Sequence, residues 1–269
     1  RHQCRLGGPG RQGGLPGMVV VTRLAPAGEF EAGVMGFAHA EVVFGDGAGE
    51  TGIVAGGYDN LIDGCTMTNN GALYGTKGYP AWGGAICTVG DHCTIQNCIA
   101  YENRGEALMV YGGATYAIIQ DCISYNNKAY NLYVSSSQNV IVRRNIVYQT
   151  KPEYKQTGIA IGNWAEAEEY GYTDIYNNFV MGCAVNFITQ TPASEELDLN
   201  HVNISYNTFV NSVGYGGGGY NMGVYFRPEI NAYTNSTFQN NIVLEEATER
   251  VPISVESSHS GLTFSHNCW

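Results

Sequence analysis

Apolar and polar residues alternate along this chain in short segments rather than in long helical runs. Segments such as Cys93-Thr-Ile-Gln, Ala117-Ile-Ile-Gln and Val140-Ile-Val-Arg place apolar side chains at every second position. A period of two is typical of a strand with one buried face. Each of these segments is followed, two residues later, by Asn or Cys. The pattern predicts many short strands separated by tight turns.

The same segment recurs along the chain. Its closing Asn or Cys falls at Cys65, Cys98, Cys122, Asn145, Asn178, Asn207, Asn241 and Asn267. The shortest separations between these positions are 23 and 24 residues, which fit one coil of a β-solenoid, and the longer ones fit the same coil with an inserted loop. A second strand precedes each copy and a third follows it, so the repeat predicts three short strands per coil.

Stacking of such coils explains both the apolar and the Asn/Cys positions. One row of apolar side chains is expected to stack inside the solenoid, because a single coil cannot bury its own apolar face: Ile95, Ile119, Val142, Ile175, Ile204, Phe238 and Phe264. The Asn residues are expected to stack at a turn, to bond backbone groups there and to tolerate a left-handed conformation. Cys65, Cys98 and Cys122 would fill the same column as small buried groups, at a spacing that would also permit a disulfide.

Three stretches resemble a known family: Glu106-Ala-Leu-Met-Val-Tyr-Gly-Gly-Ala-Thr115, Asn131-Leu-Tyr-Val, and Asn139-Val-Ile-Val-Arg-Arg-Asn-Ile-Val-Tyr148. They are similar to the right-handed parallel β-helix repeat-containing proteins of the pectate-lyase-like superfamily, whose architecture occurs in pectate lyases, polygalacturonases, alginate lyases and phage tailspikes. The resemblance implies an all-β, right-handed, single-stranded parallel β-helix of about eight coils. It specifies the fold far more strongly than any activity.

The N-terminal segment differs from the rest of the chain. Residues 1–45 contain no Asn and no Tyr, and Gly and Pro cluster in Gly7–Gly17. Met18–Val21 and Val42–Phe44 are apolar enough to form strands. We therefore predict a β-helix domain over 46–269. Residues 1–45 would be a cap for the end coil or a linker, unless they are a segment foreign to the gene.

Charge and cysteine usage exclude several classes of function. A formal net charge of −11 disfavours nucleic acid as a partner and, without a basic patch or bridging Ca²⁺, disfavours a polyanionic substrate. No apolar run is long enough to span a membrane. None of the eight cysteines forms a CxxC pair, so a zinc ribbon is disfavoured, and disulfides or buried thiols remain as alternatives.

Strand alternation predicts which side chains point outward from the sheet that precedes each Asn/Cys segment. The first outward row is Val54, Cys87, Met109, Tyr133, Ala160, Phe187, Tyr225 and Ser254. The second is Val89, Tyr111, Ser135, Gly162, Thr189, Arg227 and Glu256. Stacking on sugar rings, a partner protein or an inserted loop over this face would each explain so many apolar and aromatic residues.

The family resemblance makes this face the expected substrate site. A glycan would lie across Tyr111, Tyr133, Phe187, Tyr225 and Arg227, with Trp164 from the insertion 163–172 at one rim. The other large insertions, 74–84, 191–199 and 214–220, border the same face in sequence. Loops of this length on a rigid scaffold often carry function.

Candidate catalytic groups are few and lack a family motif. Hydrolysis would need two carboxylates, for which Glu229, Glu256, Glu106 and the Glu166–Glu169 cluster are candidates. Elimination would need a base and a cation, for which Arg227 is best placed, followed by Lys77 and Lys155. The paired Asp and Gly-His-Gly motifs of polygalacturonases are absent, and Asp91-His92 lacks the context found in pectate lyases. No cofactor is indicated beyond Ca²⁺, which could serve an elimination.

Two hypotheses follow from these observations. The first is a carbohydrate-related protein, a polysaccharide lyase or glycoside hydrolase acting on a polysaccharide or oligosaccharide outside the cell or at its surface. The second is a non-catalytic extracellular solenoid that binds a ligand as a rigid rod. Catalytic groups that converge beside the aromatic residues would favour the first hypothesis.

Overall fold

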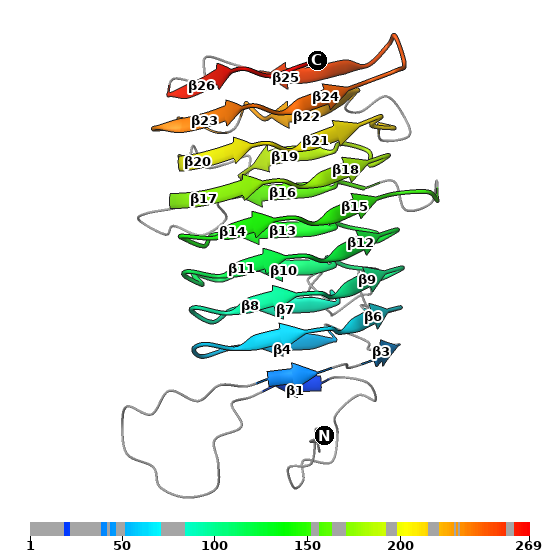
Figure 1. The fold of residues 1–269 in the computed structure, drawn as a ribbon, viewed down its shortest axis with the longest axis vertical. Coiled ribbons are helices and arrows are strands. Elements are labelled where there is room, and N and C mark those ends of the chain that lie inside the picture. Colours follow the sequence, from blue (N-terminus) through cyan, green and yellow to red (C-terminus); the bar gives the residue numbers. More distant parts are fainter. Residues whose placement is uncertain are drawn as a thin grey trace, which may run out of the picture.

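The structure is a computed structural model that describes the strands at 19–21, 39–41 and 44–46 and then residues 52–70, 84–151, 156–162, 171–191, 198–214, 221–228, 230, 232–256 and 261–269. These residues form a parallel β-helix with three long sheets (Figure 1). Neighbouring strands run parallel throughout, from the pairing of 19–21 with 53–55 near the N-terminus to that of 236–239 with 262–265 near the C-terminus. The predicted fold class is confirmed.

Sheet A contains the strand that precedes each Asn/Cys segment, and it consists of β1 (Val19–Val21), β4 (Ile53–Ala55), β7 (Ile86–Thr88), β10 (Leu108–Val110), β13 (Leu132–Ser135), β16 (Ile159–Gly162), β19 (Phe187–Gln190), β22 (Met222–Phe226) and β25 (Val251–Val255). Sheet B carries the segment itself, in β2 (His39–Glu41), β5 (Leu61–Asp63), β8 (Thr94–Gln96), β11 (Ile118–Gln120), β14 (Ile141–Arg143), β17 (Gly171–Tyr176), β20 (Asn200–Ser205), β23 (Ser236–Gln239) and β26 (Leu262–Ser265). Sheet C follows, with β3 (Phe44–Asp46), β6 (Thr66–Thr68), β9 (Ile99–Tyr101), β12 (Ile123–Tyr125), β15 (Ile146–Tyr148), β18 (Phe179–Met181), β21 (Thr208–Val210) and β24 (Ile242–Leu244).

Strands β1, β2 and β3 come from the N-terminal part of the chain and pair with β4, β5 and β6, so they extend all three sheets by one coil. The division into a segment 1–45 and a domain 46–269 stays a prediction.

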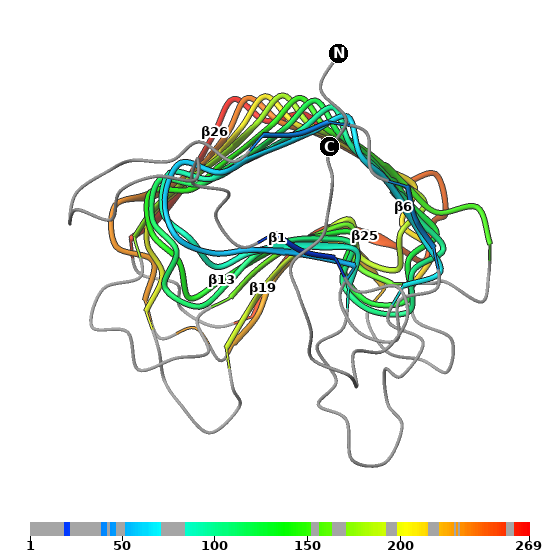
Figure 2. The same ribbon diagram turned by 90° about the horizontal axis from the view of Figure 1, so that it is seen from below.

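The interior of the solenoid is filled by inward side chains from all three sheets. Seen along the axis, the sheets enclose this core (Figure 2). The row expected from the sequence is confirmed, because Ile95, Ile119 and Val142 are register partners in sheet B and are fully buried. Toward the C-terminus the core becomes aromatic, and Phe226 contacts Phe238 and Phe264 at ring-centroid distances of 5.8 and 5.6 Å.

The Asn column between sheets B and C forms a continuous hydrogen-bonded ladder. The Oδ1 atom of Asn178 accepts from the backbone N and from Nδ2 of Asn145, both at 3.0 Å. Its Nδ2 donates to the Val142 carbonyl at 2.9 Å and to Oδ1 of Asn207 at 2.9 Å. The predicted ladder is therefore confirmed. The left-handed conformation, however, belongs to the residue before each Asn, such as Asn177 with φ 56°.

A second ladder, which was not predicted from the sequence, closes the turn after sheet C. Asn70 donates through its backbone N and its Nδ2 to Oδ1 of Asn103, and Asn103 donates in the same way to Asn127. The signal was present, because each of these residues follows a sheet C strand by two positions. The two ladders fix the turns on both sides of sheet C.

The cysteines in the described residues are all free thiols. Cys65, Cys98 and Cys122 occupy the Asn column, and the thiols of Cys98 and Cys122 each donate to a backbone carbonyl at 3.1 Å. The hydrogen bond with Cys122 is the largest influence that raises the pKa of Cys98, to about 12. These three cysteines are therefore buried thiols, one of the two alternatives that the sequence left open.

Candidate functional site

The outer face of sheet A is the face that the sequence selected as the substrate site. Its central outward row is Val54, Cys87, Met109, Tyr133, Ala160, Ile188, Tyr225 and Ser254, as the strand registers show. The alternation is thus confirmed for every coil in this row except one. In that coil the outward side chain is Ile188, and the prediction for Phe187 is wrong.

Phe187 points into the solenoid and is fully buried. Its ring lies 6.0 Å from that of Phe209 and 5.9 Å from that of Phe226. The turn between β18 and β19 holds residues 182–186, whereas the turns before β10 and β13 hold one residue more, 102–107 and 126–131. Because strand side chains alternate, a shift of one residue exchanges the two faces. The same shift turns Thr189 inward, where its Oγ1 pairs with the Tyr233 hydroxyl at 2.5 Å, and places Gln190 outward.

Truncating Phe187 to Ala should therefore cost about 3–5 kcal/mol of stability, as expected for a buried Phe that leaves a cavity. Phe179→Ala is the matched control, since Phe179 is 39% exposed on sheet C and its removal should cost less than about 1 kcal/mol. Urea denaturation of both variants measures the difference. Equal stabilities would mean that Phe187 lies outside the core.

The outward row is not a solvent-exposed platform. Tyr133 is 1% exposed and Tyr225 is 3% exposed, and both belong to a second apolar cluster with Cys87, Met109, Ala160, Val185 and Ile188. Tyr111 is half-buried at the margin of this cluster. The expectation of exposed stacking rings is corrected for Tyr133 and Tyr225. The cluster is a second core outside the solenoid.

Glu106 is a buried carboxyl group beside this cluster. It precedes β10, next to Tyr130 on the neighbouring coil, and is only 2% exposed. Its Oε2 atom has no hydrogen-bond partner among the described residues. Burial raises the pKa of Glu106 to about 7. Burial and the nearby Glu106 also raise the pKa of the Cys87 thiol to about 12. Glu106 can therefore hold a proton near neutral pH.

Two buried polar side chains lie farther along the same face. Ser135 and Gln190 flank Gly162 in the second outward row. The Ser135 Oγ and the Gln190 Nε2 form no hydrogen bond of normal geometry within the part of the chain that the structure describes. Both nevertheless lie near the Tyr133 hydroxyl, whose pKa is raised by burial and lowered in part by these two side chains.

The Gln190 side chain also joins the aromatic part of the face. Its Oε1 accepts from the Tyr130 hydroxyl at 2.9 Å, and the ring of Tyr130 lies 4.7 Å from that of Tyr133. Tyr130 was not predicted from the sequence because it lies in a turn rather than a strand, and Gln190 was not predicted because of the shorter turn before β19.

The catalytic candidates Arg227 and Glu256 lie at the other end of the face. The Tyr225 hydroxyl donates to Oε2 of Glu256 at 2.9 Å, and Arg227 and Glu256 directly follow neighbouring strands. Sheet A places β10 and β25 five strands apart, so Glu106 and Glu256 are separated by roughly 24 Å at the usual strand spacing. This distance is too large for a pair of carboxylates acting on one glycosidic bond. Glu229, Trp164, Lys77, Lys155 and the Glu166–Glu169 cluster lie outside the described residues.

The histidines occupy structural surroundings. Asp91 accepts from the backbone N and the hydroxyl of Thr115, both at 2.8 Å, and the His92 ring stacks on Tyr116 at 4.8 Å. His201 stacks on Tyr172 at 4.2 Å. Within the described ranges, no three acidic, His or Cys side chains gather as metal ligands, and no helix is long and apolar enough to cross a membrane. A role for Ca²⁺ stays a prediction.

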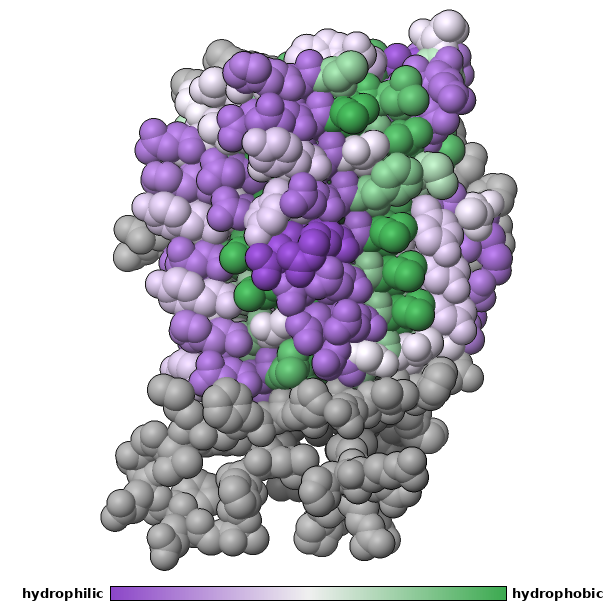
Figure 3. Space-filling view, viewed as in Figure 1, coloured by the Kyte–Doolittle hydropathy of each residue, from purple (hydrophilic) through white to green (hydrophobic). Residues whose placement is uncertain are grey.

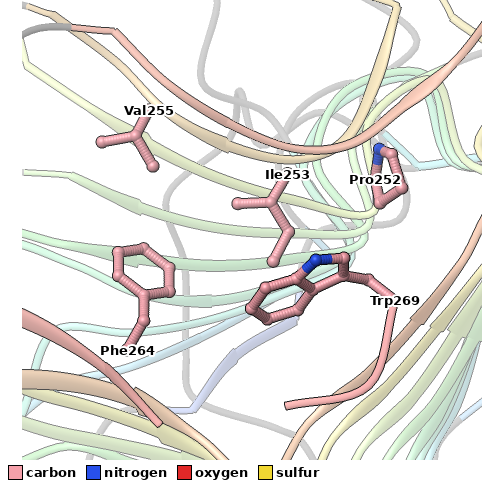
Figure 4. A pocket seen from close by; sticks show the side chains of 5 residues that line it. All are labelled: Pro252, Ile253, Val255, Phe264 and Trp269. Atoms are coloured by element: carbon pink, nitrogen blue, oxygen red, sulfur yellow. The ribbon is translucent and has the colours of Figure 1, made fainter.

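A separate apolar pocket of about 380 Å³ opens at the C-terminal end of the solenoid. Its walls are Pro252, Ile253, Val255, Phe264 and Trp269, and Figure 4 shows the Trp269 indole beside Ile253 and facing Phe264. The side chains of these residues bear no titratable group. The pocket is the end of the core, and it is distinct from the outer face of sheet A.

Several solved structures are similar to this chain. An E. coli bacteriophage HK620 tailspike protein, studied as a double mutant, has a TM-score of 0.56 at 15% identity, over 86% of this chain and 44% of the tailspike chain. The tailspike protein gp49 of Acinetobacter baumannii bacteriophage Fri1, a capsular polysaccharide depolymerase, gives 0.47 at 11% identity, over 86% and 43%. DFA-IIIase from Arthrobacter chlorophenolicus A6, without its lid and in complex with GF2, gives 0.45 at 13% identity, over 89% and 64%.

The chain spans less than two thirds of each of these three structures. With the HK620 tailspike protein, at a TM-score of 0.56 and 15% identity, it shares the fold alone. No curated protein sequence matches the chain. The family model of the right-handed β-helix region matches residues 40–180, which is more than half of the 269 residues. The chain therefore belongs to the right-handed β-helix family.

Proposed function

We propose that this β-helix hydrolyses a polysaccharide or oligosaccharide on the outer face of sheet A, with Glu106 as the proton donor. The observation that carries the proposal is a buried carboxyl group outside the solenoid core, with one oxygen unpartnered among the described residues and a pKa raised to about 7. A structural role would favour a paired carboxylate, because an unpaired buried polar group destabilises the fold. A raised carboxyl pKa is, by contrast, what a general acid needs at neutral pH.

The polar surroundings support a hydroxylated ligand. Ser135 and Gln190 each keep hydrogen-bonding capacity on this face, and the half-buried ring of Tyr130 supplies aromatic surface beside them. Hydroxyl groups of a sugar can both donate and accept, so they suit a Ser hydroxyl and an amide N–H. The acidic net charge of −11 favours a neutral glycan. Such a substrate would place the protein outside the cell or at its surface.

Hydrolysis also requires a second carboxylate, at roughly 5–9.5 Å from the first. The insertion after β16 contains Glu166, Glu168 and Glu169, and it begins at the end of the strand that bears Ala160 and Gly162. These three residues are among the remaining candidates that the sequence offers, and they lie outside the described residues. The large separation of Glu106 and Glu256 argues against Glu256 as the second carboxylate.

A non-catalytic solenoid that binds a glycan is the second candidate. One observation favours it: Glu256, which accepts a hydrogen bond from Tyr225 of the apolar cluster, lies roughly 24 Å from Glu106, too far away to form a catalytic pair with it. In that case Glu106, Ser135 and Gln190 would only bind the sugar.

A panel of neutral and acidic polysaccharides, with and without Ca²⁺, separates these possibilities. New reducing ends without absorbance at 235 nm are the expected result and would indicate hydrolysis. Rising absorbance would indicate a lyase and would overturn the role of Glu106 as an acid in hydrolysis. Glycan binding without products would support the non-catalytic solenoid, and neither binding nor products would contradict both candidates.

A further inference from the structure

Sheet C presents an apolar outer face that no function proposed above uses. Each of the seven strands from β6 to β24 has two outward positions, which the registers align in two rows. One row is Thr66, Ile99, Ile123, Ile146, Phe179, Thr208 and Ile242, and the other is Thr68, Tyr101, Tyr125, Tyr148, Met181, Val210 and Leu244. We call these fourteen side chains the sheet C face. None of them is charged.

Large side chains of the sheet C face are open to solvent. Ile146 is 46% exposed, Ile242 is 49% exposed and Leu244 is 48% exposed, and Phe179 and Met181 are also exposed. Figure 3 shows a hydrophobic band along the solenoid on this side of the molecule, with residues of intermediate hydropathy on its right and hydrophilic residues on its left. Contiguous apolar surface of this extent in a soluble protein marks an interaction site.

The face is also regular. The rings of Tyr101, Tyr125 and Tyr148 stack at 5.0 and 4.8 Å with interplanar angles of 4° and 3°, so their faces are used within the stack. Those rings therefore offer mainly their edges and hydroxyl groups, the other hydroxyl groups of the face belong to Thr66, Thr68 and Thr208, and the remaining eight side chains are apolar. A glycan would gain little here, because the ring faces on which a sugar would stack are already used within the stack.

We propose that the sheet C face joins two copies of this chain face to face. A partner must be as straight and as apolar as this strip, and a second copy supplies such a surface. Seven strands at the usual spacing give a strip about 30 Å long, and two such strips packed as sheet on sheet bury on the order of 1,000 Å², near the lower limit for a specific interface.

Charge supports the same partner. Each chain carries a net charge of −11, so two copies repel each other over most of their surface. Two charged residues at the border of the strip, Lys151 and Glu102, form an ion pair with each other, with the Lys151 Nζ 2.5 Å from the Glu102 Oε1. The uncharged strip is thus where two acidic copies approach with the least repulsion.

The test measures the oligomeric state of the full chain by sedimentation velocity, up to about 100 µM, well above the micromolar Kd expected for such an interface. Phe179→Lys combined with Ile242→Lys places two cations on the sheet C face, two strands apart. The matched control is Ser205→Lys combined with Ser265→Lys, which are two strands apart on the outer face of sheet B.

We expect dimers for the wild type and for the control, and a dissociation constant at least about 100-fold weaker for the sheet C variant. Circular dichroism and thermal unfolding establish that both variants are folded. A wild type that stays monomeric over the whole range overturns the proposal. So does a folded sheet C variant that dimerises as tightly as the control, or a control that dissociates equally.

Discussion

Glu106→Gln should abolish turnover while making the protein more stable at alkaline pH. The amide keeps the size of the side chain but cannot donate a proton to a leaving group, so kcat should fall by about 10²–10⁴-fold. The wild type should lose activity as the pH rises through about 7, where Glu106 loses its proton. Reducing-end assays on the substrate found in the panel measure both effects.

Replacing Glu106 should raise the stability of the folded protein at high pH, although it lowers activity. Its pKa is raised from 4.5 to about 7 in the folded protein, so the stabilisation from the neutral form is complete below pH 4.5 and is lost as the pH rises through 7. At pH 8 this loss amounts to about 3 kcal/mol, and Gln avoids it. Urea denaturation at pH 5 and at pH 8 should therefore show the variant gaining on the wild type mainly at the higher pH.

Glu256→Gln is the control, because Glu256 is an exposed carboxylate of the same sheet. It should reduce activity far less than Glu106→Gln does. Full activity of Glu106→Gln would refute the catalytic role of Glu106. The predicted stability profile could still hold in that case, because it depends only on burial of the carboxyl group.

Asn178→Ala should destabilise the central coils by about 3 kcal/mol, because the substitution leaves several buried groups unpaired at about 1–3 kcal/mol each. It removes an acceptor from two N–H groups of Asn145 and a donor from the Val142 carbonyl. Because each coil packs only on its neighbours, the loss should appear as earlier unfolding of this region in hydrogen exchange.

Asn177→Gly provides the comparison, since Asn177 is exposed and has φ 56°, a conformation that Gly adopts readily. Its stability should lie within about 0.5 kcal/mol of the wild type. If Asn178→Ala were equally harmless, the ladder would contribute nothing to stability, and the Asn repeat would need another explanation.

The coil and its Asn/Cys ladder could be predicted because the same local chemistry recurs along the chain. The apolar residue inside each sheet B strand and the Asn or Cys after it have the same surroundings in successive coils, so the pattern reports a three-dimensional arrangement directly. The prediction failed where a repeat departs from this periodicity. A turn shorter by one residue before β19 exchanged Phe187 and Ile188 between the two faces.

Period-two alternation and one repeated hydrogen-bonding residue were enough to predict the architecture, the interior row of sheet B and the outward positions of regular coils. Which outward faces are covered could be learned only from the folded chain. Tyr133 and Tyr225 on sheet A and Ile146 and Ile242 on sheet C are alike in sequence pattern, yet the first two are buried and the last two are exposed. Alternation specifies the direction of a side chain within its strand, whereas burial of an outward side chain depends on segments far away in the chain.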